Sequence, residues 1–312
     1  MAHNLFTSEQ AARSMLAALR YLTVLPRTVR MDFSTEFVAG RGQTVNVLGP
    51  ISAGKAKVYT KANREARDAI EFNELDQTWV AVKLEDQLYN AVRLPDDWAT
   101  FTLQSLETQV IRPQAESVID DLATPLITKM TAIKNVQSSE KAENGNVPIP
   151  DIAADGSNVL QSIIAARRVL NQRKVPFAGR TLAVGSGIEA VLLGVPQLQK
   201  VNEAGDNGAL LRQATIGNLF GFTIVADPNL PADFAVAYHR DAFAFVTRPS
   251  RVPEGAPMGH TISEAGFALR HIMQYNPNQL EDQSIVDTFY GAETLDAKRA
   301  VSFKLAAAGA GA

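Results

Sequence analysis

The sequence predicts an α+β fold, and two observations carry this prediction. Apolar residues recur at the three- and four-residue spacing of a helix between Leu94 and Asn135. Segments 78–85 and 234–249 instead show the alternating or continuous apolar patterns of strands. A chain of 312 residues with 46% apolar side chains can bury a large core, and its length suggests one large or two ordinary domains.

The composition argues against several classes of function. The formal charge of −3 and the pI of about 5.9 give no bulk attraction to nucleic acid or to an acidic membrane. The chain has no cysteine, which excludes disulfides and thiolate chemistry and suits a reducing cytoplasm. No apolar run approaches the roughly 18–20 residues of a membrane span, and no signal-peptide pattern opens the chain. We therefore expect a soluble protein without membrane contact.

The first 48 residues predict an N-terminal arm. Thr7-Ser8-Glu9-Gln10 caps an amphipathic helix that ends before Pro26. We expect this helix to pack on another segment or subunit. Membrane binding is disfavoured because its polar face carries only Arg13 and Arg20. A strand at 44–48 follows.

Residues 49–85 form a polar loop closed by the strand at 78–85. From Lys55 to Asp76, basic residues come first and acidic residues later, with only Glu65 breaking the order. The segment is either a solvated loop or a projecting hairpin whose charged limbs meet a neighbouring copy. A loop of about 25 residues is unusual inside a compact domain, which favours the intermolecular role. The candidate contact residues are Lys57, Lys61, Arg64 and Arg67, facing Asp68, Glu71, Glu74 and Asp76 of another copy.

The helical segment that follows is predicted to be long and interrupted. Leu94-Pro95-Asp96-Asp97 is typical of a helix start, and a helix from there to Asn135 would be on the order of 50 Å long. Pro113 and Pro125 each remove an interior hydrogen bond, so a kink or break is expected at both. The predicted apolar face comprises Trp98, Phe101, Leu106, Val110, Ile111, Val118, Ile119, Leu122, Leu126, Met130 and Ile133.

Two glycine motifs resemble nucleotide-binding turns, although we favour plain turns of the chain at both. Residues 49–55 have the glycine and lysine spacing of a phosphate loop, but Ala56 replaces the hydroxyl that would hold magnesium. Gly185-Ser186-Gly187 follows a strand at 181–184, as in a dinucleotide site, although the helix after it is short. A nucleotide-dependent enzyme using this turn is therefore the alternative function. Its acidic partner would be Glu203 or Asp206, in a loop.

A second helix is predicted from Val159 to Asn171, capped by Asp155-Gly156-Ser157, with Ile163, Ile164, Val169 and Leu170 inward. Four cations crowd its end: Arg167, Arg168, Arg173 and Lys174. Cations suit a helix C-terminus, and we favour this account over a nucleic-acid patch because no aromatic residues are interleaved.

The sequence offers few candidate catalytic residues. His3, His239, His260 and His271 are far apart in sequence and lack metal-site spacing. His239 and Asp241 fall on one face of a strand and suggest either an acid–base pair or a strand-end salt bridge, which we favour. We expect no catalytic residue, no cofactor and no metal.

The segment from Thr215 to Pro249 carries a family resemblance. It contains Leu219-Phe220-Gly221-Phe222, then Leu230-Pro231, then His239-Arg240-Asp241-Ala242. This order resembles the major capsid (coat) proteins of tailed bacteriophages, whose shell fold is shared by herpesviruses and encapsulin nanocompartments. The strands at 266–275, where pattern alone also allows a helix, and at 300–305 are consistent with it.

The resemblance implies four regions. They are an N-terminal arm (1–48), an extended β-hairpin loop (49–93), a peripheral domain with a spine helix and long sheet (94–150 and 258–290), and an axial domain with the C-terminal tail (151–257 and 291–312). We expect no inserted domain and no long N-terminal scaffolding region.

The resemblance also implies function and partners. The chain would assemble as hexamers and pentamers into an icosahedral shell around double-stranded DNA, in a virion assembled in the host bacterial cytoplasm. Expected partners are a scaffolding protein, a portal, a possible decoration protein, and packaged DNA through weak non-specific contact. An encapsulin-like nanocompartment shell is the remaining alternative.

Overall fold

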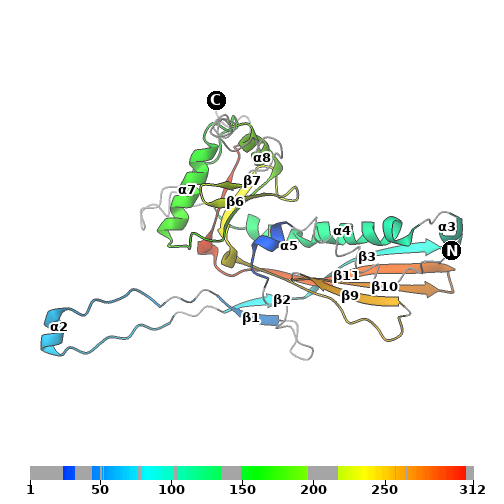
Figure 1. The fold of residues 1–312 in the computed structure, drawn as a ribbon, viewed down its shortest axis with the longest axis horizontal. Coiled ribbons are helices and arrows are strands. Elements are labelled where there is room, and N and C mark those ends of the chain that lie inside the picture. Colours follow the sequence, from blue (N-terminus) through cyan, green and yellow to red (C-terminus); the bar gives the residue numbers. More distant parts are fainter. Residues whose placement is uncertain are drawn as a thin grey trace.

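The computed structural model describes residues 24–31, 44–49, 51, 53–75, 79–101, 105–134, 149–195, 217–256, 258–264 and 266–306. Two five-stranded sheets, a run of helices along one of them and a long projecting finger make up the fold (Figure 1). The predicted α+β class is confirmed. The N-terminal helix before Pro26, the loop with Glu203 and Asp206, and the last six residues lie outside the described part of the chain.

The larger sheet is antiparallel and is built around one long strand. Its order is β3-β11-β10-β9, and β8 pairs with the far end of β11, from Phe289↔Arg248 to Thr294↔Phe243. The strands are β3 (Asp86–Pro95), β8 (Phe243–Arg248), β9 (Met258–Glu264), β10 (Phe267–Asn276) and β11 (Glu281–Thr294). The segment at 266–275, which pattern alone left open, is therefore a strand.

The helical segment is interrupted, as predicted, but it begins later. Leu94 and Pro95 end β3, so the first helix starts at Asp96. Pro113 and Pro125 each occupy the first turn of a helix, where a missing N–H costs no intrahelical bond. The pieces are α3 (Asp96–Phe101), a π-helical turn (Glu107–Ile111), α4 (Arg112–Leu122) and α5 (Thr124–Thr131).

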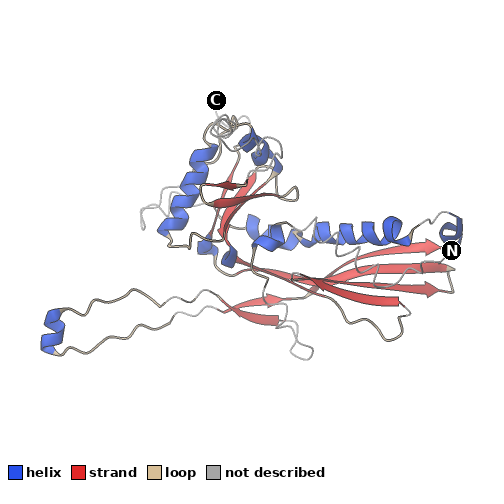
Figure 2. Ribbon diagram, in the orientation of Figure 1, coloured by secondary structure: helices blue, strands red, loops and turns tan. Residues whose placement is uncertain are grey.

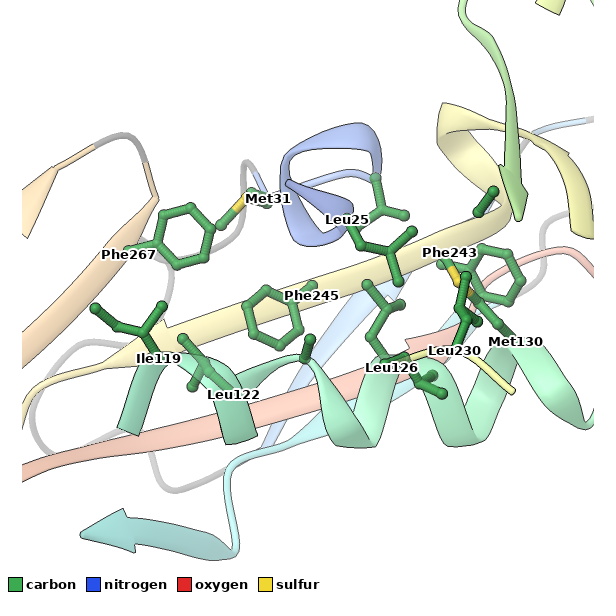
Figure 3. Close-up of a cluster of buried hydrophobic side chains, with 14 of the residues drawn as sticks. Leu25, Met31, Ile119, Leu122, Leu126, Met130, Leu230, Phe243, Phe245 and Phe267 are labelled. Carbon is green, nitrogen blue, oxygen red and sulfur yellow. The ribbon is translucent and has the colours of Figure 1, made fainter. Parts of the chain in front are cut away.

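The apolar face of α4 and α5 forms the first core together with the larger sheet (Figure 3). Leu122 and Leu126 lie against Phe245, and Leu25 from a short 3-10 helix (Leu25–Thr28) covers the same cluster. The predicted face is confirmed from Val110 to Ile133. It fails at its start, because the Phe101 side chain is 87% exposed.

The smaller sheet has the order β12-β7-β4-β6-β5, and only β4 and β6 are parallel. Helices α7 (Val159–Gln172) and α8 (Ser186–Leu193) enclose a second core with it. Two expectations for α7 are wrong. Its N-cap residue is Asn158, and Ile164 is half exposed. The strands are β4 (Arg180–Val184), β5 (Asn218–Leu219), β6 (Phe222–Ala226), β7 (Phe234–His239) and β12 (Ala300–Lys304).

Strand pairing crosses the predicted region boundaries. The boundary at residue 93 falls inside β3, which pairs with β11 along its whole length. Strand β8 belongs to the predicted axial region, yet it also pairs with β11. The larger sheet therefore joins segments from three of the four predicted regions.

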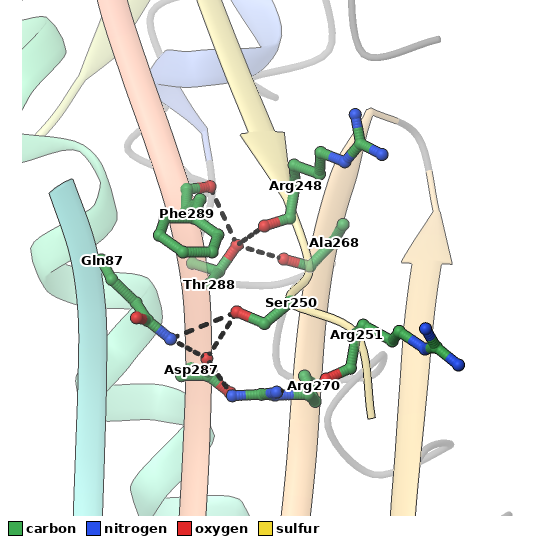
Figure 4. Close-up of polar contacts among 9 residues, drawn as sticks. All are labelled: Gln87, Arg248, Ser250, Arg251, Ala268, Arg270, Asp287, Thr288 and Phe289. Carbon is green, nitrogen blue, oxygen red and sulfur yellow. Dashed lines mark hydrogen bonds and ion pairs between the residues drawn. The ribbon is translucent and has the colours of Figure 1, made fainter. Parts of the chain in front are cut away.

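A buried ion pair ties the strands of the larger sheet together (Figure 4). Arg270 on β10 donates two hydrogen bonds to the Asp287 carboxylate on β11, at 2.7 and 2.8 Å. Asp287 is only 1% exposed, and it also accepts from Gln87 on β3 and from Ser250 after β8. Bidentate geometry and these further donors offset the cost of burying the charge.

Replacing Asp287 by Ala should lower the free energy of unfolding by about 3–5 kcal/mol, because Arg270 would keep a buried charge without its partner. Denaturant unfolding measures this loss. The control is Arg251→Ala, since the Arg251–Glu254 pair is exposed on both sides. Equal stabilities of the two variants would contradict the assigned role of the ion pair.

A second buried polar chain links α4 to the sheet. The Ser284 hydroxyl donates to Gln114 Oε1 at 2.7 Å, which leaves its oxygen to accept from His271 Nε2 at 3.0 Å. Gln114 in turn donates to the Ser284 carbonyl. Burial lowers the pKa of His271 to about 4.

The unfolded chain, with an ordinary histidine pKa near 6.5, therefore takes up a proton before the folded chain does. Stability from His271 should be fully present above about pH 6.5 and should fall by about 3 kcal/mol as the pH drops towards 4. Unfolding measured across this range, with His271→Gln as the comparison, tests the effect. A His271→Gln variant with the same pH dependence would refute it.

Candidate functional site

A long finger projects from the root formed by β1 (Thr44–Leu48) and β2 (Trp79–Lys83), which pair antiparallel (Figures 1 and 2). We call residues 53–75 the contact finger. The root sits directly on the central strand of the larger sheet, because a Cβ built on Gly291 of β11 would lie 2.3 Å from the Lys83 carbonyl oxygen. Only glycine permits this approach.

The tip of the contact finger is a short helix, α2 (Lys61–Ala66), which closes by local contacts. Thr60 is its N-cap and accepts from the Asn63 amide at 3.3 Å. Arg67 ends it in the left-handed conformation, with φ of 54°. The Tyr59 hydroxyl donates to the carbonyls of Asn63 and Asp68, at 3.0 and 2.7 Å. The tip therefore has a defined shape without help from the sheets.

The two limbs of the contact finger are extended but form no strand ladder in the described residues. Besides the Tyr59 contact near the tip, two side-chain contacts cross between them. Asn73 donates to the Lys55 carbonyl at 2.9 Å, and Lys57 pairs with Glu71 at 2.7 Å. Both limbs are exposed along almost their whole length. Their backbone groups and side chains are thus available to another molecule.

The predicted contact residues divide into two groups. Lys57 and Glu71 pair with each other inside the chain, and Lys61 lies 3.7 Å from Glu65 on α2. The described residues provide no ion pair for Arg64, Arg67, Asp68 or Glu74, and Asp76 lies outside the described part. Exposed pairs of this kind contribute little stability. Contact with another copy stays a prediction for all eight residues.

Exposed apolar side chains on the contact finger were missed by the sequence analysis. Val58 is 84% exposed, Ile70 67% and Phe72 91%. The sequence signal was the presence of large apolar residues in a segment too polar to form a core. The charged residues around them concealed it. Several exposed large apolar side chains on one projection are a basis for proposing a protein contact there.

The glycine turn at Gly185-Ser186-Gly187 is filled by the chain itself. The amides of Gly187 and Ile188 both donate to the Ala232 carbonyl, at 3.1 and 3.2 Å. A Cβ on Gly185 would lie 2.0 Å from the Pro231 carbonyl oxygen. The amides that would bind phosphate are therefore used, and the glycines serve close packing of the loop before β7.

His239 and Asp241 do not form an acid–base pair. Arg240–Ala242 is a 3-10 turn, and His239 Nδ1 accepts the Asp241 backbone N–H at 3.2 Å. Burial lowers the pKa of His239, although the nearby Asp241 opposes this shift. The Asp241 carboxylate lies 3.6 Å from His239 Nδ1, as the favoured contact predicts, and 3.5 Å from Arg299, which adds a second partner.

The described residues contain no cluster of three side chains suited to hold a metal ion. Among the same residues, no helix is long and apolar enough to cross a membrane. The distinctive surface of the molecule is the contact finger.

Comparison with known proteins identifies the family. The sequence model described as phage capsid protein matches residues 97–275, more than half of the chain. The chain belongs to the phage capsid protein family. Its fold is similar to that of a solved structure of Mycobacterium phage Che8, at 20% identity and a TM-score of 0.64 with 90% of each chain covered. A search of curated proteins returns no match.

Two further capsid-like folds support the assignment. The capsid of the cyanophage P-SCSP1u matches with 10% identity and a TM-score of 0.58, covering 86% of this chain and 84% of the other. Gordonia phage Cozz matches with 15% identity and a TM-score of 0.55, covering 92% and 87%. The resemblance to tailed-phage capsid proteins is confirmed, and the nucleotide-dependent enzyme has no support.

Replacing Phe72 by Ser should leave the capsid protein folded but raise the concentration needed for shell assembly at least about tenfold, because a buried aromatic anchor contributes roughly 2 kcal/mol or more to an interface. Light scattering measures assembly, and thermal unfolding checks the fold. The control is Phe101→Ser, whose ring is equally exposed but lies on α3. An equal effect of both variants would remove the special role of the finger.

Proposed function

We propose that this chain is the major capsid protein of a tailed bacteriophage and assembles as hexamers and pentamers into an icosahedral shell around double-stranded DNA. Its role is structural rather than catalytic. The observation that carries the proposal is the contact finger, a defined projection whose apolar side chains have no cover in the described part of their own chain.

The contact finger requires a partner to account for its composition. A solvated loop of this length would carry polar residues, whereas Phe72 and Val58 expose most of their surface to water. Burial of such side chains contributes about 1.5–3 kcal/mol each. A neighbouring copy of the same chain supplies this cover at every position of a symmetric shell, so one modest contact is repeated many times.

The regions take the following roles in the proposal. The arm (1–48) and the loop (49–93) extend over neighbouring copies and contact them. The first core, along α4 and α5, combines residues of the peripheral domain (94–150 and 258–290) with residues of the axial domain (151–257 and 291–312), and the axial domain contains most of the second core. The two cores share strands β4, β7 and β12, which supports a rigid subunit with separate contact regions.

The partners follow from the assembly. We propose a scaffolding protein that guides shell growth, a portal at one vertex and a possible decoration protein, with assembly in the host bacterial cytoplasm. The mildly acidic chain, with a formal charge of −3, supports weak rather than tight contact with packaged DNA over most of its surface.

Electron microscopy of the protein expressed alone and together with products of neighbouring genes tests this function. Closed shells that package DNA are expected when the phage partners are present. Shells that instead enclose a protein cargo would identify a nanocompartment, and a soluble monomer under all conditions would overturn the proposal.

Charge reversal at the finger tip tests the predicted contacts. Arg64→Glu combined with Arg67→Glu should leave the monomer folded, because neither side chain has an ion pair in the described residues, yet it should impair shell formation by placing like charges together. The matched control is Lys134→Glu with Arg251→Glu, which makes the same charge change elsewhere. Normal particles from the finger variant, counted in micrographs, would argue against the contact.

A further inference from the structure

The surface at the C-terminal end of α7 is strongly basic. Between Asp155 and Glu189 the sequence carries five Arg or Lys residues and no Asp or Glu. The fold adds cations from the turns after β7 and before β12. We call the following residues the basic surface: Arg168, Arg173, Lys174, Arg240 and Lys298.

Hydrogen bonds bring together the segments that carry most of these residues. Arg173 Nη1 donates to the carbonyls of Lys298 and Ala300, both at 3.2 Å, which joins the end of α7 to the turn before β12. The Arg240 amide donates to the Gly179 carbonyl at 3.1 Å, which joins the turn after β7 to the loop before β4. The contact of Arg299 with Asp241, at 3.5 Å, joins the two turns, so three separate segments that carry cations lie side by side.

A further cation lies beneath this surface. The buried Arg180 guanidinium donates to neutral oxygens at Val175, Pro176 and Asn171, so these hydrogen bonds leave its charge in place. Burial and the charge of Arg167 lower the pKa of Arg180, a sign of crowded cations.

The carboxylates of the adjacent turns are engaged by another arginine. Asp241 and Asp296 both lie against Arg299, at 3.5 and 3.2 Å. Together they carry one negative charge more than Arg299 offsets, and Arg168 and Lys174 extend into solvent from exposed positions on α7 and just after it.

The chemistry of the basic surface indicates the class of ligand. Clustered Arg and Lys side chains bind phosphate groups and release the counterions condensed on a duplex. Binding of single strands needs successive aromatic rings for base stacking. The described part of this surface offers one exposed ring, Phe177, whose face lies 4.8 Å from the Arg180 guanidinium. Backbone contact with a duplex is therefore favoured over stacking.

We propose that the basic surface binds the phosphate backbone of double-stranded DNA without sequence specificity. The inference rests on the proposed function, which places the chain around a duplex genome. It gives the expected weak DNA contact a location, on a chain whose overall charge is negative.

The test uses full-length unassembled subunits and a fluorescently labelled 20-base-pair duplex of random sequence, with anisotropy measured across a salt series. Binding should weaken as salt rises. Arg168→Gln with Lys174→Gln should lower the affinity at least about tenfold at low salt. It should also reduce the slope of log K against log salt by about two, because two phosphates would no longer be neutralised.

The matched control is Lys134→Gln with Arg251→Gln, an equal charge change at exposed sites outside the basic surface. It should retain the wild-type slope. Absence of binding by the wild-type chain, an unchanged slope in the Arg168/Lys174 variant or an equal drop in affinity in the control would overturn the inference. Competition by polyglutamate as effective as by DNA would also overturn it, because the surface would then fit an acidic protein segment.

Electron microscopy of the same variants separates this inference from the proposed function. Shells formed by the Arg168/Lys174 variant that bind less DNA support both. Wild-type subunits that bind DNA through this surface but never form shells would overturn the proposed function alone. Thermal unfolding of each variant confirms that the substitutions, all on the surface, leave the subunit folded.

Discussion

The packing of α4 and α5 onto the larger sheet is the interaction on which the rest of the structure depends. Ile119, Leu122 and Leu126 are almost fully buried, and they contact aromatic residues from β8 and β10. These strands come from distant parts of the sequence, so one apolar stripe assembles segments that no local interaction would join. The buried Arg270–Asp287 pair adds directional specificity, because a slip in strand register would separate its partners.

The conformation of the contact finger depends on local hydrogen bonds rather than on a buried core. Its tip is determined locally, by the Thr60 cap and the two bonds from Tyr59, whereas its limbs have little to hold them together. A segment of this kind has a defined shape but little stability of its own. Its conformation would become more stable if a partner covered its apolar side chains. In the proposed shell, the body of the subunit would fold before assembly, and the finger would form its contacts during assembly.

Much of the fold could be predicted from the sequence because periodicity reports burial. The stripe from Val110 to Ile133 and the strands at β7 and β12 were recognisable in this way. The error at Leu94-Pro95 has a physical reason. Pro at the end of an edge strand and Pro at the start of a helix look alike, and β3 is an edge strand whose last residue is Pro95.

The contact surfaces were harder to predict because they depend on which residues the fold brings together. The sequence around Phe72 did not indicate that its side chain would be exposed, because isolated apolar residues also occur in charged segments where they are buried. The cations after α7 suit a helix end taken alone, and only the approach of Lys298 and Arg240 reveals a continuous surface. The glycine turn at 185–187 illustrates the opposite error, since its pattern fits a nucleotide while its amides bind Ala232.

The seating of the finger root on Gly291 has a mechanical consequence. Because the Lys83 carbonyl rests against the backbone of β11 with no side chain between them, a pull at the tip is transmitted to a hydrogen-bonded strand instead of a flexible loop. The root of the finger is therefore a stiff attachment, and force applied to the finger reaches the larger sheet directly.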